Sequence, residues 1–489
     1  MEVKEKKGVF SSYKVDAALC DEVFVDDASA RTHYNKLLSQ FNKLTPQDFK
    51  ELNEYAKISF YNQGITFAVY SDKQRGVERI MPFDLFPRII PASEWDLLEK
   101  GIIQRNMAIN LFLHDVYNGQ KILKDKIVPA ELVLTAKYYF KAMEGVKPVG
   151  GIYNHVSGTD IIKHNDGKFY VLEDNVRCPS GVSYVIANRI AMKKTLPNLL
   201  KHYKVHSVEE YPEQLLSIMQ SVAAEGLDNP NCVVLTPGMY NSAYYEHSFL
   251  ALNMGIQLVE GRDLFVEKNF VYMKTIHGPK RVDVIYRRVD DDFLDPHVWR
   301  KDSVLGVPGI LQAYKEGNVS LLNAPGCGAA DDKAVYSYIP DIIKYYLGEE
   351  PILNNVQTYR CELDDDYKFV KENIQNLVIK PVDESGGYGI LIGPKATKQE
   401  LDDYKKLIAE NRRKYIAQPV LSLSVHSTFI DETDVFEPRH IDLRTYCLMG
   451  KDKNFLVKGG LSRVALKRGS LIVNSSQGGG AKDTWVLEE

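Results

Sequence analysis

The stretch from Gly158 to Gly181 constrains the fold most strongly, because its pattern is typical of a β-hairpin. Asp166-Gly167 at its centre is the dipeptide that a two-residue type I′ turn favours, since both central residues of that turn take positive φ. Strand-like runs flank the dipeptide on both sides. A two-residue turn places Asp160 directly opposite Glu173, and Asn175 then shares the face of Glu173.

Two directly opposed carboxylates repel one another, because cross-strand neighbours lie within about 5.5 Å between their Cβ atoms. A hard cation turns that repulsion into binding, and the oxygens of Asp160, Glu173 and Asn175 suit Mg²⁺ or Mn²⁺ better than Zn²⁺. Arg177, two residues beyond Asn175, could hold an anion beside the cation. The alternative is a solvated hairpin whose polar face is acidic. The register depends on the turn length, so the stretch alone leaves both interpretations open.

The composition is that of an ordinary globular protein. The 489 residues suffice for two to four domains, and the net charge of −4 gives no general attraction to nucleic acid or anionic lipid. The six cysteines form no CxxC pair, which argues against a zinc ribbon and fits a reducing cytoplasm. No run of eighteen apolar residues occurs, so we expect a cytoplasmic protein without a membrane segment. The sequence does not indicate the oligomeric state.

The N-terminal part predicts a mainly helical section. Thr45-Pro46 looks like an N-cap with proline at the first helical position, opening a helix to Phe60. A short strand is expected at Ile65–Tyr70, and Met81–Arg88 is interpreted as a loop broken by prolines. Ala92–Leu123 again has helical periodicity. Its Gln104 and Arg105 could reach a site, but the pattern favours the helix surface.

Residues 231–325 predict an α/β unit. Its expected strands lack strict alternation, which is typical of strands buried on both faces, and they are Cys232–Leu235, Ile256–Glu260, Phe270–Lys274 and Val282–Arg288. A helix over Tyr244–Met254 should end at Gly255. Ligands of such sheets bind at the carboxyl ends of the strands, which draws attention to Thr236–Ser242 and to Arg287-Arg288. The arginine pair could hold a substrate carboxylate, or could pair with the acids at 290–292.

A second chemical stretch lies at Leu377–Pro394, where a strand leads into a glycine-rich turn and another strand. Lys380 sits inside the apolar strand, which is costly unless an anion neutralises it. The loop Glu384–Gly389 can bring backbone N–H groups close to phosphates, although it is no Walker A motif. The strand at Tyr415–Val420, with Gln418, could form an adenine-binding edge. Lys333 could contact phosphate or pair with the preceding aspartates.

Together these features resemble an ATP-grasp enzyme whose metal strand comes before its nucleotide strands. In detail the chain resembles the circularly permuted ATP-grasp type 2 family, which is related in pattern to the glutathionylspermidine synthetases. The resemblance covers most of residues 75–489 and rests on segments such as VLEDNVRCPSGVSY, VDVIYRRVDDDFLDP, HIDLR and GGLSRVALKRGSLIV. It implies an α/β (α+β) chain with a circularly permuted ATP-grasp fold. The implied parts are an N-terminal mainly helical section (1–140), a metal-binding piece (141–205), an inserted Rossmann-like α/β domain (206–330) and a nucleotide-binding piece (331–489).

The resemblance also assigns roles to individual residues. The implied Mg²⁺ or Mn²⁺ ligands are Asp160, Glu173 and Asn175. The implied ATP-binding residues are Lys333, Lys380 and Gln418, with Glu384, Ser385, Gly386, Gly387, Tyr388 and Gly389 in or beside a mobile lid. Arg177 and Arg463 look like groups that steady the acyl phosphate and the γ-phosphoryl group, and Arg287 or Arg288 looks like the substrate-carboxylate arginine.

The implied function is ATP-dependent ligation of a carboxylate to an amine through an acyl phosphate. Both substrates would be small molecules or peptides, and their identity is not indicated. Two alternatives stay open: another phosphotransferase on the same scaffold, and a nucleotide-binding module without turnover.

Overall fold

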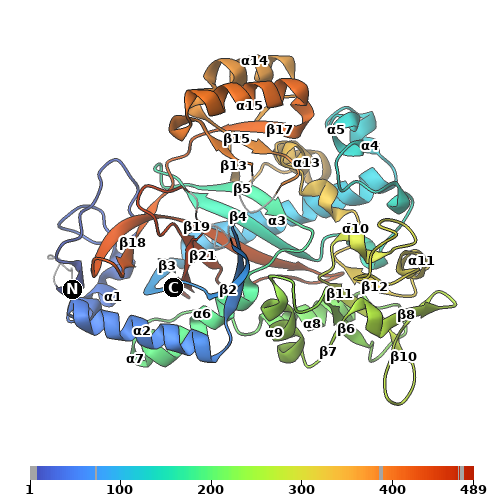
Figure 1. The fold of residues 1–489 in the computed structure, drawn as a ribbon, viewed down its shortest axis with the longest axis horizontal. Coiled ribbons are helices and arrows are strands. Elements are labelled where there is room, and N and C mark those ends of the chain that lie inside the picture. Colours follow the sequence, from blue (N-terminus) through green and yellow to red (C-terminus); the bar gives the residue numbers. More distant parts are fainter. Residues whose placement is uncertain (1–7, 72–73, 385–388, 472, 474–477) are drawn as a thin grey trace.

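A mixed α/β fold surrounds one large twisted sheet (Figure 1). The computed structural model describes residues 8–71, 74–384, 389–471, 473 and 478–489, with the backbone alone over 66–79. Among these residues, nine strands form the central sheet. Its order is β13 (Asn354–Asn355), β5 (Phe169–Asn175), β4 (Val156–Lys163), β19 (Val435–Met449), β21 (Leu461–Val464), β22 (Gly480–Val486) and β3 (Phe83–Ile90), with β18 (Val425–Ile430) and β20 (Asn454–Leu456) also paired to β19.

The predicted hairpin is formed by β4 and β5, and Asp160 does lie opposite Glu173. The two-residue turn was wrong: His164 N–H donates to the Lys168 carbonyl, so three residues lie between them. A bulge then restores the predicted register, because Ile161 pairs with Val171 while Asp160 pairs with Glu173. Leu172 is the extra residue of this bulge. The opposition of the two carboxylates is therefore confirmed, by two one-residue shifts that cancel.

The expectation of a loop at Met81–Arg88 was wrong, since Phe83–Ile90 is strand β3 at the end of the sheet path. It runs parallel to β22, and the register shifts between Lys482 and Thr484, opposite the part of β3 that contains Pro87. A proline is tolerated there because an edge strand or a bulge needs no ladder N–H from every residue. Packing of apolar side chains on this strand outweighs the local proline signal.

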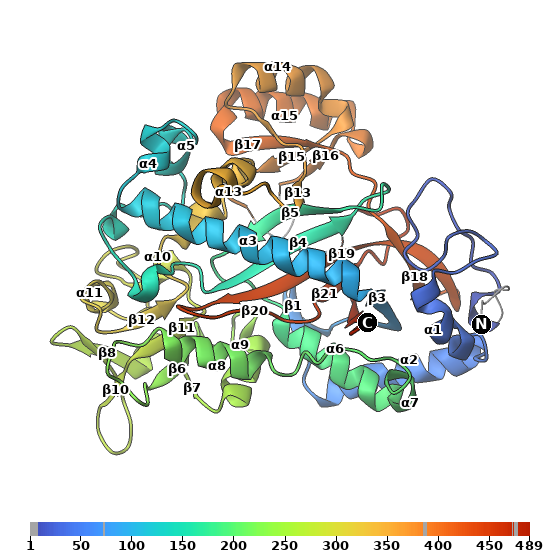
Figure 2. The ribbon, with the colours of Figure 1, turned by 180° about the vertical axis from the view of Figure 1, so that it is seen from behind.

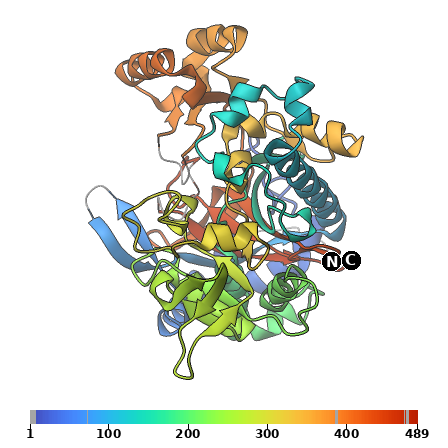
Figure 3. The ribbon, with the colours of Figure 1, turned by 90° about the vertical axis from the view of Figure 1, so that its right-hand side faces the viewer.

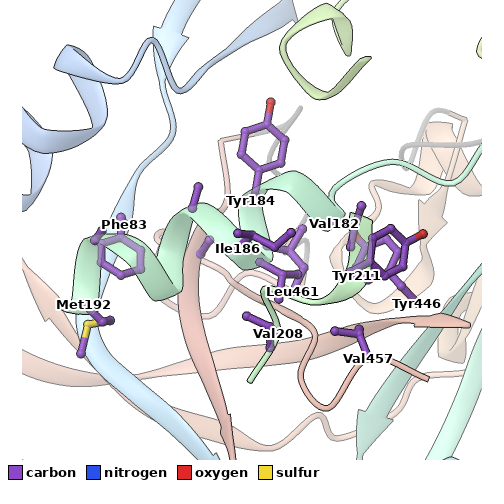
Figure 4. Packing of buried hydrophobic residues seen from close by; sticks show 14 of the residues in the cluster. Phe83, Val182, Tyr184, Ile186, Met192, Val208, Tyr211, Tyr446, Val457 and Leu461 are labelled. Carbon is purple, nitrogen blue, oxygen red and sulfur yellow. The ribbon is translucent and has the colours of Figure 1, made fainter. Parts of the chain in front are cut away.

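Helices cover both faces of the sheet. In Figure 2, α3 (Ala92–Tyr117) crosses in front of the sheet, and α6 (Val182–Thr195) and α2 (Pro46–Asn62) lie below it, where they pack against β22 and β3. The predicted start of α2 is confirmed, because Thr45 and Asp48 form a capping box. Figure 4 shows Val182 and Ile186 of α6 near Leu461 of β21, where apolar packing fixes the helix beside the sheet.

Shorter helical segments complete this part of the chain. They are α1 (Asn35–Phe41), α4 (Lys121–Lys124), α5 (Ala130–Leu134) and α7 (Pro197–Leu200). The strands β1 (Thr66–Ser71) and β2 (Gln74–Ile80) pair as a separate hairpin, which agrees with the strand expected at residues 65–70.

The α/β unit contains a four-stranded parallel sheet. Its order is β12 (Ser320–Leu322), β11 (Val284–Arg287), β6 (Cys232–Leu235) and β7 (Gln257–Val259), with the helices α8 (Tyr211–Ser221), α9 (Tyr244–Met254), α10 (Asp291–Leu294) and α11 (Ile310–Lys315) in the same region. Gly255 ends α9 in the left-handed conformation, as predicted. The strand near Phe270 belongs elsewhere. It is β9 (Phe270–Met273), the middle strand of an antiparallel sheet with β10 (Lys280–Val282) and β8 (Leu264–Glu267). Buried and partly exposed residues alternate along β9, so the expectation that this strand is buried on both faces was wrong.

A separate sheet of four strands lies beyond β5. Its order is β14 (Tyr359–Arg360), β17 (Tyr415–Pro419), β15 (Leu377–Pro381) and β16 (Leu391–Ile392). The helices α14 (Asp364–Asn373) and α15 (Lys398–Glu410) cover its outer side (Figures 1 and 3), while α12 (Lys333–Tyr336) and α13 (Ile339–Leu347) connect the α/β unit to it. Over the part of the chain that is described, no helix is long and apolar enough to span a bilayer.

Candidate functional site

Strand register builds a row of charged side chains across the middle of the central sheet. Glu173 of β5 pairs with Asp160 of β4, and Asp160 pairs with Arg444 of β19. One strand further, Asp442 of β19 lies opposite Arg463 of β21. Directly paired residues point to the same face, so four strands contribute to one polar surface.

Two arginines hold both oxygens of Asp160. Arg444 donates to Oδ1 at 2.6 Å and to Oδ2 at 2.8 Å, and Arg463 donates to Oδ2 at 2.8 Å. Burial alone would raise the pKa of the Asp160 carboxyl, but the guanidinium groups of Arg444 and Arg463 hold this pKa below its ordinary value. Asp160 is therefore a carboxylate, and it fixes the direction of both guanidinium groups.

A cavity of about 160 Å³, which we call the inter-sheet cavity, separates the central sheet from the β14–β17 sheet. Its walls are largely apolar, and they include Leu172, Val378, Ile390, Ile392, Pro419, Val420, Leu421, Leu423, Leu471 and Val473. Gln418 of β17 also lines it, and its Nε2 donates to the Thr358 hydroxyl at 3.0 Å. The bulge explains why Leu172 and Glu173 both reach this cavity, since successive residues of a regular strand point to opposite faces.

Two lysines meet at the polar end of the inter-sheet cavity. Nζ of Lys333 donates to the Glu384 carbonyl at 2.6 Å and lies 3.3 Å from Oε2 of Glu173. Burial, together with the positive charge of Lys333, lowers the pKa of Lys380 to about 8, although the carboxylates of Glu173 and Asp160 oppose this shift. The two lysines place positive charge at the Glu173 end of the cavity. Gly389 is described, but Ser385, Gly386, Gly387 and Tyr388 lie outside the described residues.

A smaller cavity of about 30 Å³, the hairpin-end cavity, adjoins Glu173, Asn175 and Lys333. Arg177 lines it and stacks on the Tyr138 ring, with its guanidinium carbon 3.8 Å from the ring centroid. The same guanidinium donates to Asp331 at 2.7 Å. Arg177 is thus held rigidly next to the end of the hairpin.

A third cavity, of about 570 Å³, adjoins the hairpin-end cavity at Glu173, Asn175 and Arg177. We call it the arginine cavity, because it is lined by Arg177, Arg288, Arg444 and Arg463, together with Glu173, Asn175 and the residues at 178–181 and 241–243. It reaches from the hairpin to the carboxyl ends of β6 and β11, where ligands of parallel sheets bind.

The two consecutive arginines at the end of β11 have different surroundings in the structure. Arg287 is 1 % exposed and donates to the Asn323 carbonyl at 2.7 Å and to Asp291 at 2.9 Å, so it holds the fold together. Arg288 lines the arginine cavity while contacting Glu246 at 3.1 Å and the Pro179 carbonyl at 2.7 Å.

Gln104 and Arg105 do not lie on the helix surface, as the periodicity of their helix had suggested. Both are buried, and Nε of Arg105 contacts both carboxylate oxygens of Asp174 at 2.8 Å, on the opposite face of β5 from Glu173. Arg105 therefore supports the hairpin from behind. Sequence reasoning also missed Arg444, Tyr138 and His247, although the HIDLR motif contains the first of them.

Two of the three predicted metal ligands, Glu173 and Asn175, are placed so that they could bind a hard divalent cation together. Glu173 and Asn175 offer oxygens at the lining of the hairpin-end and arginine cavities, and carboxylate and amide oxygens are the donors that Mg²⁺ accepts. Asp160 lines the inter-sheet cavity instead, and both of its oxygens are bound to arginines. Within the described residues, no group of three or more His, Cys, Asp or Glu side chains could hold a metal.

Comparison with known proteins gives consistent results. A family model described as circularly permuted ATP-grasp type 2 matches residues 87–465. An uncharacterised protein of Synechocystis sp. is 50% identical over 96% of this chain and 97% of its own length. A Frankia casuarinae protein, provisionally named glutamate–cysteine ligase 2-2, is 39% identical over 95% of this chain, which spans 53% of that relative.

A solved structure supports the fold. The glutathione synthetase-like effector of Globodera pallida superposes with a TM-score of 0.56 over 90% of this chain and 98% of its own, at 12% identity.

Proposed function

Since this chain belongs to the circularly permuted ATP-grasp type 2 family, and that family implies ATP binding, we propose that it is a Mg²⁺-dependent ligase. It joins a carboxylate to an amine through an acyl phosphate. In the same proposal residues 206–330 form an inserted Rossmann-like domain between the metal-binding piece (141–205) and the nucleotide-binding piece (331–489), and residues 1–140 form the N-terminal section.

The inter-sheet cavity is the proposed nucleotide site. Its apolar walls suit a purine base, and Gln418 lies where it can contact the base edge. The phosphates then extend towards Lys333 and Lys380, whose ammonium groups neutralise them. Occupation by phosphate explains why a lysine of β15 lines this largely apolar cavity, because an ammonium held away from water without an anion is costly.

Glu173 and Asn175 would hold the metal, with Asp160 as a further oxygen donor if its arginines shift. When bound, Mg²⁺ offsets charge on the transferring phosphoryl group. The chain itself supplies the remaining cationic groups, Arg177, Arg444 and Arg463, which are already oriented by carboxylates and by Tyr138. Preoriented charge of this kind stabilises a transition state without reorganisation.

The proposed reaction has two displacements. An oxygen of the substrate carboxylate attacks the γ-phosphorus, and the bond to the β-phosphate oxygen breaks to release ADP. The amine nitrogen then attacks the acyl carbon, the bond from that carbon to the phosphate oxygen breaks, and the amine loses a proton. Arg463 lines both the inter-sheet and arginine cavities, so it can contact the phosphoryl group at their junction.

One observation carries the proposal: Glu173 lines all three cavities. A phosphoryl donor in the inter-sheet cavity and an acceptor in the arginine cavity would therefore meet at one carboxylate. The name of the Frankia relatives favours amino-acid substrates.

The test is release of ADP from MgATP with a panel of amino acids and peptides, in the presence and absence of amines. Ligation predicts ADP in equal amount with the amide and dependent on both substrates. ADP formed with a phosphorylated product that survives the amine would instead indicate a phosphotransferase. MgATP binding without any turnover across the panel would favour a nucleotide-binding module.

A further inference from the structure

His247, in the first turn of α9, occupies an unusual position in the arginine cavity. The side chain is 1 % exposed, and it lines the cavity beside Arg288. Its Nε2 atom and the Nε atom of Arg288 are both buried without a hydrogen-bond partner among the described residues. Two polar atoms without protein partners at one cavity wall are costly unless a ligand or an ordered water pairs with them.

Hydrogen bonding fixes which nitrogen of His247 carries the proton. The Thr236 hydroxyl accepts from the Gly238 N–H at 3.2 Å and lies 2.9 Å from Nδ1 of His247. Among the described groups Nδ1 is the acceptor available to the hydroxyl proton, so Nδ1 accepts and Nε2 bears the hydrogen. Burial, followed by the charge of Arg288, lowers the pKa of His247 to about 2, which keeps the ring neutral. Nε2–H is therefore a permanent donor.

The surroundings favour an anionic acceptor. Asn241, Ser242 and Ala243, at the N-terminus of the eleven-residue helix α9, line the same cavity, and a helix N-terminus carries partial positive charge. Glu246 is close to Arg288, but its Oε2 accepts from Gly181 N–H and from Ser183. Its Oε1 accepts from Nη2 of Arg288 at 3.1 Å, so both oxygens of Glu246 are already bound and the Nε–H of Arg288 is left without an acceptor among the described residues. A monoanion with two acceptor oxygens fits this site.

We propose that His247, together with the Nε–H of Arg288, forms a subsite for a substrate carboxylate that is not phosphorylated. The proposal rests on the ligase function above and names its substrate class: a molecule with a free carboxylate at the end of the arginine cavity remote from the hairpin. That carboxylate belongs either to the phosphorylated substrate, which is then a dicarboxylate, or to an amino-acid amine.

The first test needs no turnover. In the full-length protein labelled with ¹⁵N-histidine, His247 is assigned by comparison with His247→Leu. We expect an Nε2-protonated ring whose Nε2 resonance shifts on addition of L-glutamate and of glycine. L-glutamine, isoglutamine and glycinamide each lack one carboxylate, and the amide that abolishes the shift identifies the carboxylate bound.

Equal shifts from acids and amides, or no shift with any probe, would overturn the subsite. This outcome is independent of ATP hydrolysis, so it is distinguishable from failure of the ligase proposal.

The second test uses the substrate pair found by ADP release. His247→Leu should raise KM for the carboxylate-bearing substrate about 10- to 100-fold with little change in kcat, and should remove the preference over its amide. His247→Gln can place an N–H donor near Nε2 and should restore part of the affinity. His277→Leu, at an exposed histidine on the β9–β10 hairpin, is the control. Unchanged discrimination in a folded His247→Leu protein would contradict the proposal.

Discussion

Nζ of Lys333 lies 3.3 Å from Oε2 of Glu173, and the same ammonium donates to the Glu384 carbonyl at 2.6 Å. Lys333 begins α12, Glu173 lies in β5 and Glu384 follows β15. The Lys333 ammonium therefore links α12 both to the central sheet and to the segment that follows β15. A ligand that displaces this ammonium changes a contact to each of the two sheets.

Glu173→Gln should abolish the thermal stabilisation that MgATP gives the wild type. The substitution removes the carboxylate that lines all three cavities but keeps the side-chain size. A ligand at about 100 times its Kd adds roughly 2.7 kcal/mol to the folded state, so the loss is measurable by scanning calorimetry. Asp166→Asn makes the same charge change at the tip of the hairpin and should leave the stabilisation intact. Equal stabilisation of both variants would argue against a metal–nucleotide site at Glu173.

The affinity for MgATP should fall above pH 8, by up to about tenfold per pH unit. Burial lowers the pKa of Lys380 to about 8, so the free protein loses this positive charge as pH rises and binding phosphate then requires proton uptake. The folded pKa lies below the ordinary value of a lysine, so the unfolded chain binds this proton more tightly and the stability of the unliganded protein rises as pH increases from about 8 to about 10.5. Lys380→Arg stays charged and should flatten the affinity profile. Isothermal titration calorimetry between pH 7 and 9.5 measures the MgATP affinity of both proteins. The same decline of affinity with pH in the wild type and in Lys380→Arg would contradict this role of Lys380.

Arg287→Met should destabilise the protein by about 3–5 kcal/mol, because it leaves Asp291 buried without its partner. Arg288→Met should also cost stability, because Arg288 pairs with buried Glu246, but unlike Arg287→Met it should in addition weaken substrate binding, because Arg288 lines the arginine cavity. Urea unfolding and steady-state kinetics on both variants separate the two effects. A stability loss at Arg287 no larger than that of an exposed arginine such as Arg262 would contradict the structural role.

Asn323→Leu should cost about 3 kcal/mol or more of stability. The Asn323 side chain accepts from the N–H groups of His155 and Val156 at 2.7 Å and donates to the carbonyls of Val156 and Val176 at 2.6 and 2.7 Å. It therefore ties the end of β12 to both strands of the hairpin. Urea denaturation tests it, with Asn318→Leu as the control at a more exposed asparagine. A loss below 1 kcal/mol at Asn323 would show that the backbone groups find other partners.

The sequence predicted local features well because their signals are local. The capped start of α2, the strand of Lys380 and the end of α9 each depend on a few neighbouring residues. The facing carboxylates were predicted from a turn one residue too short, and they face one another because the bulge at Leu172 cancels that error. The roles of Arg444 and His247 depend instead on the pairing of β19 with β4 and on the placement of α9, which join residues far apart in the chain. The strand β3 was missed because its prolines dominate the local pattern, whereas its pairing with β22 decides the outcome.

The central claim, that the reaction passes through an acyl phosphate, is tested most directly by tracing an oxygen atom of the substrate carboxylate. With a substrate carboxylate labelled with ¹⁸O, ligation through an acyl phosphate transfers one labelled oxygen to inorganic phosphate, which mass spectrometry detects. We predict one ¹⁸O in each phosphate released with the amide. Unlabelled phosphate from a reaction that still consumes ATP and both substrates would contradict the account.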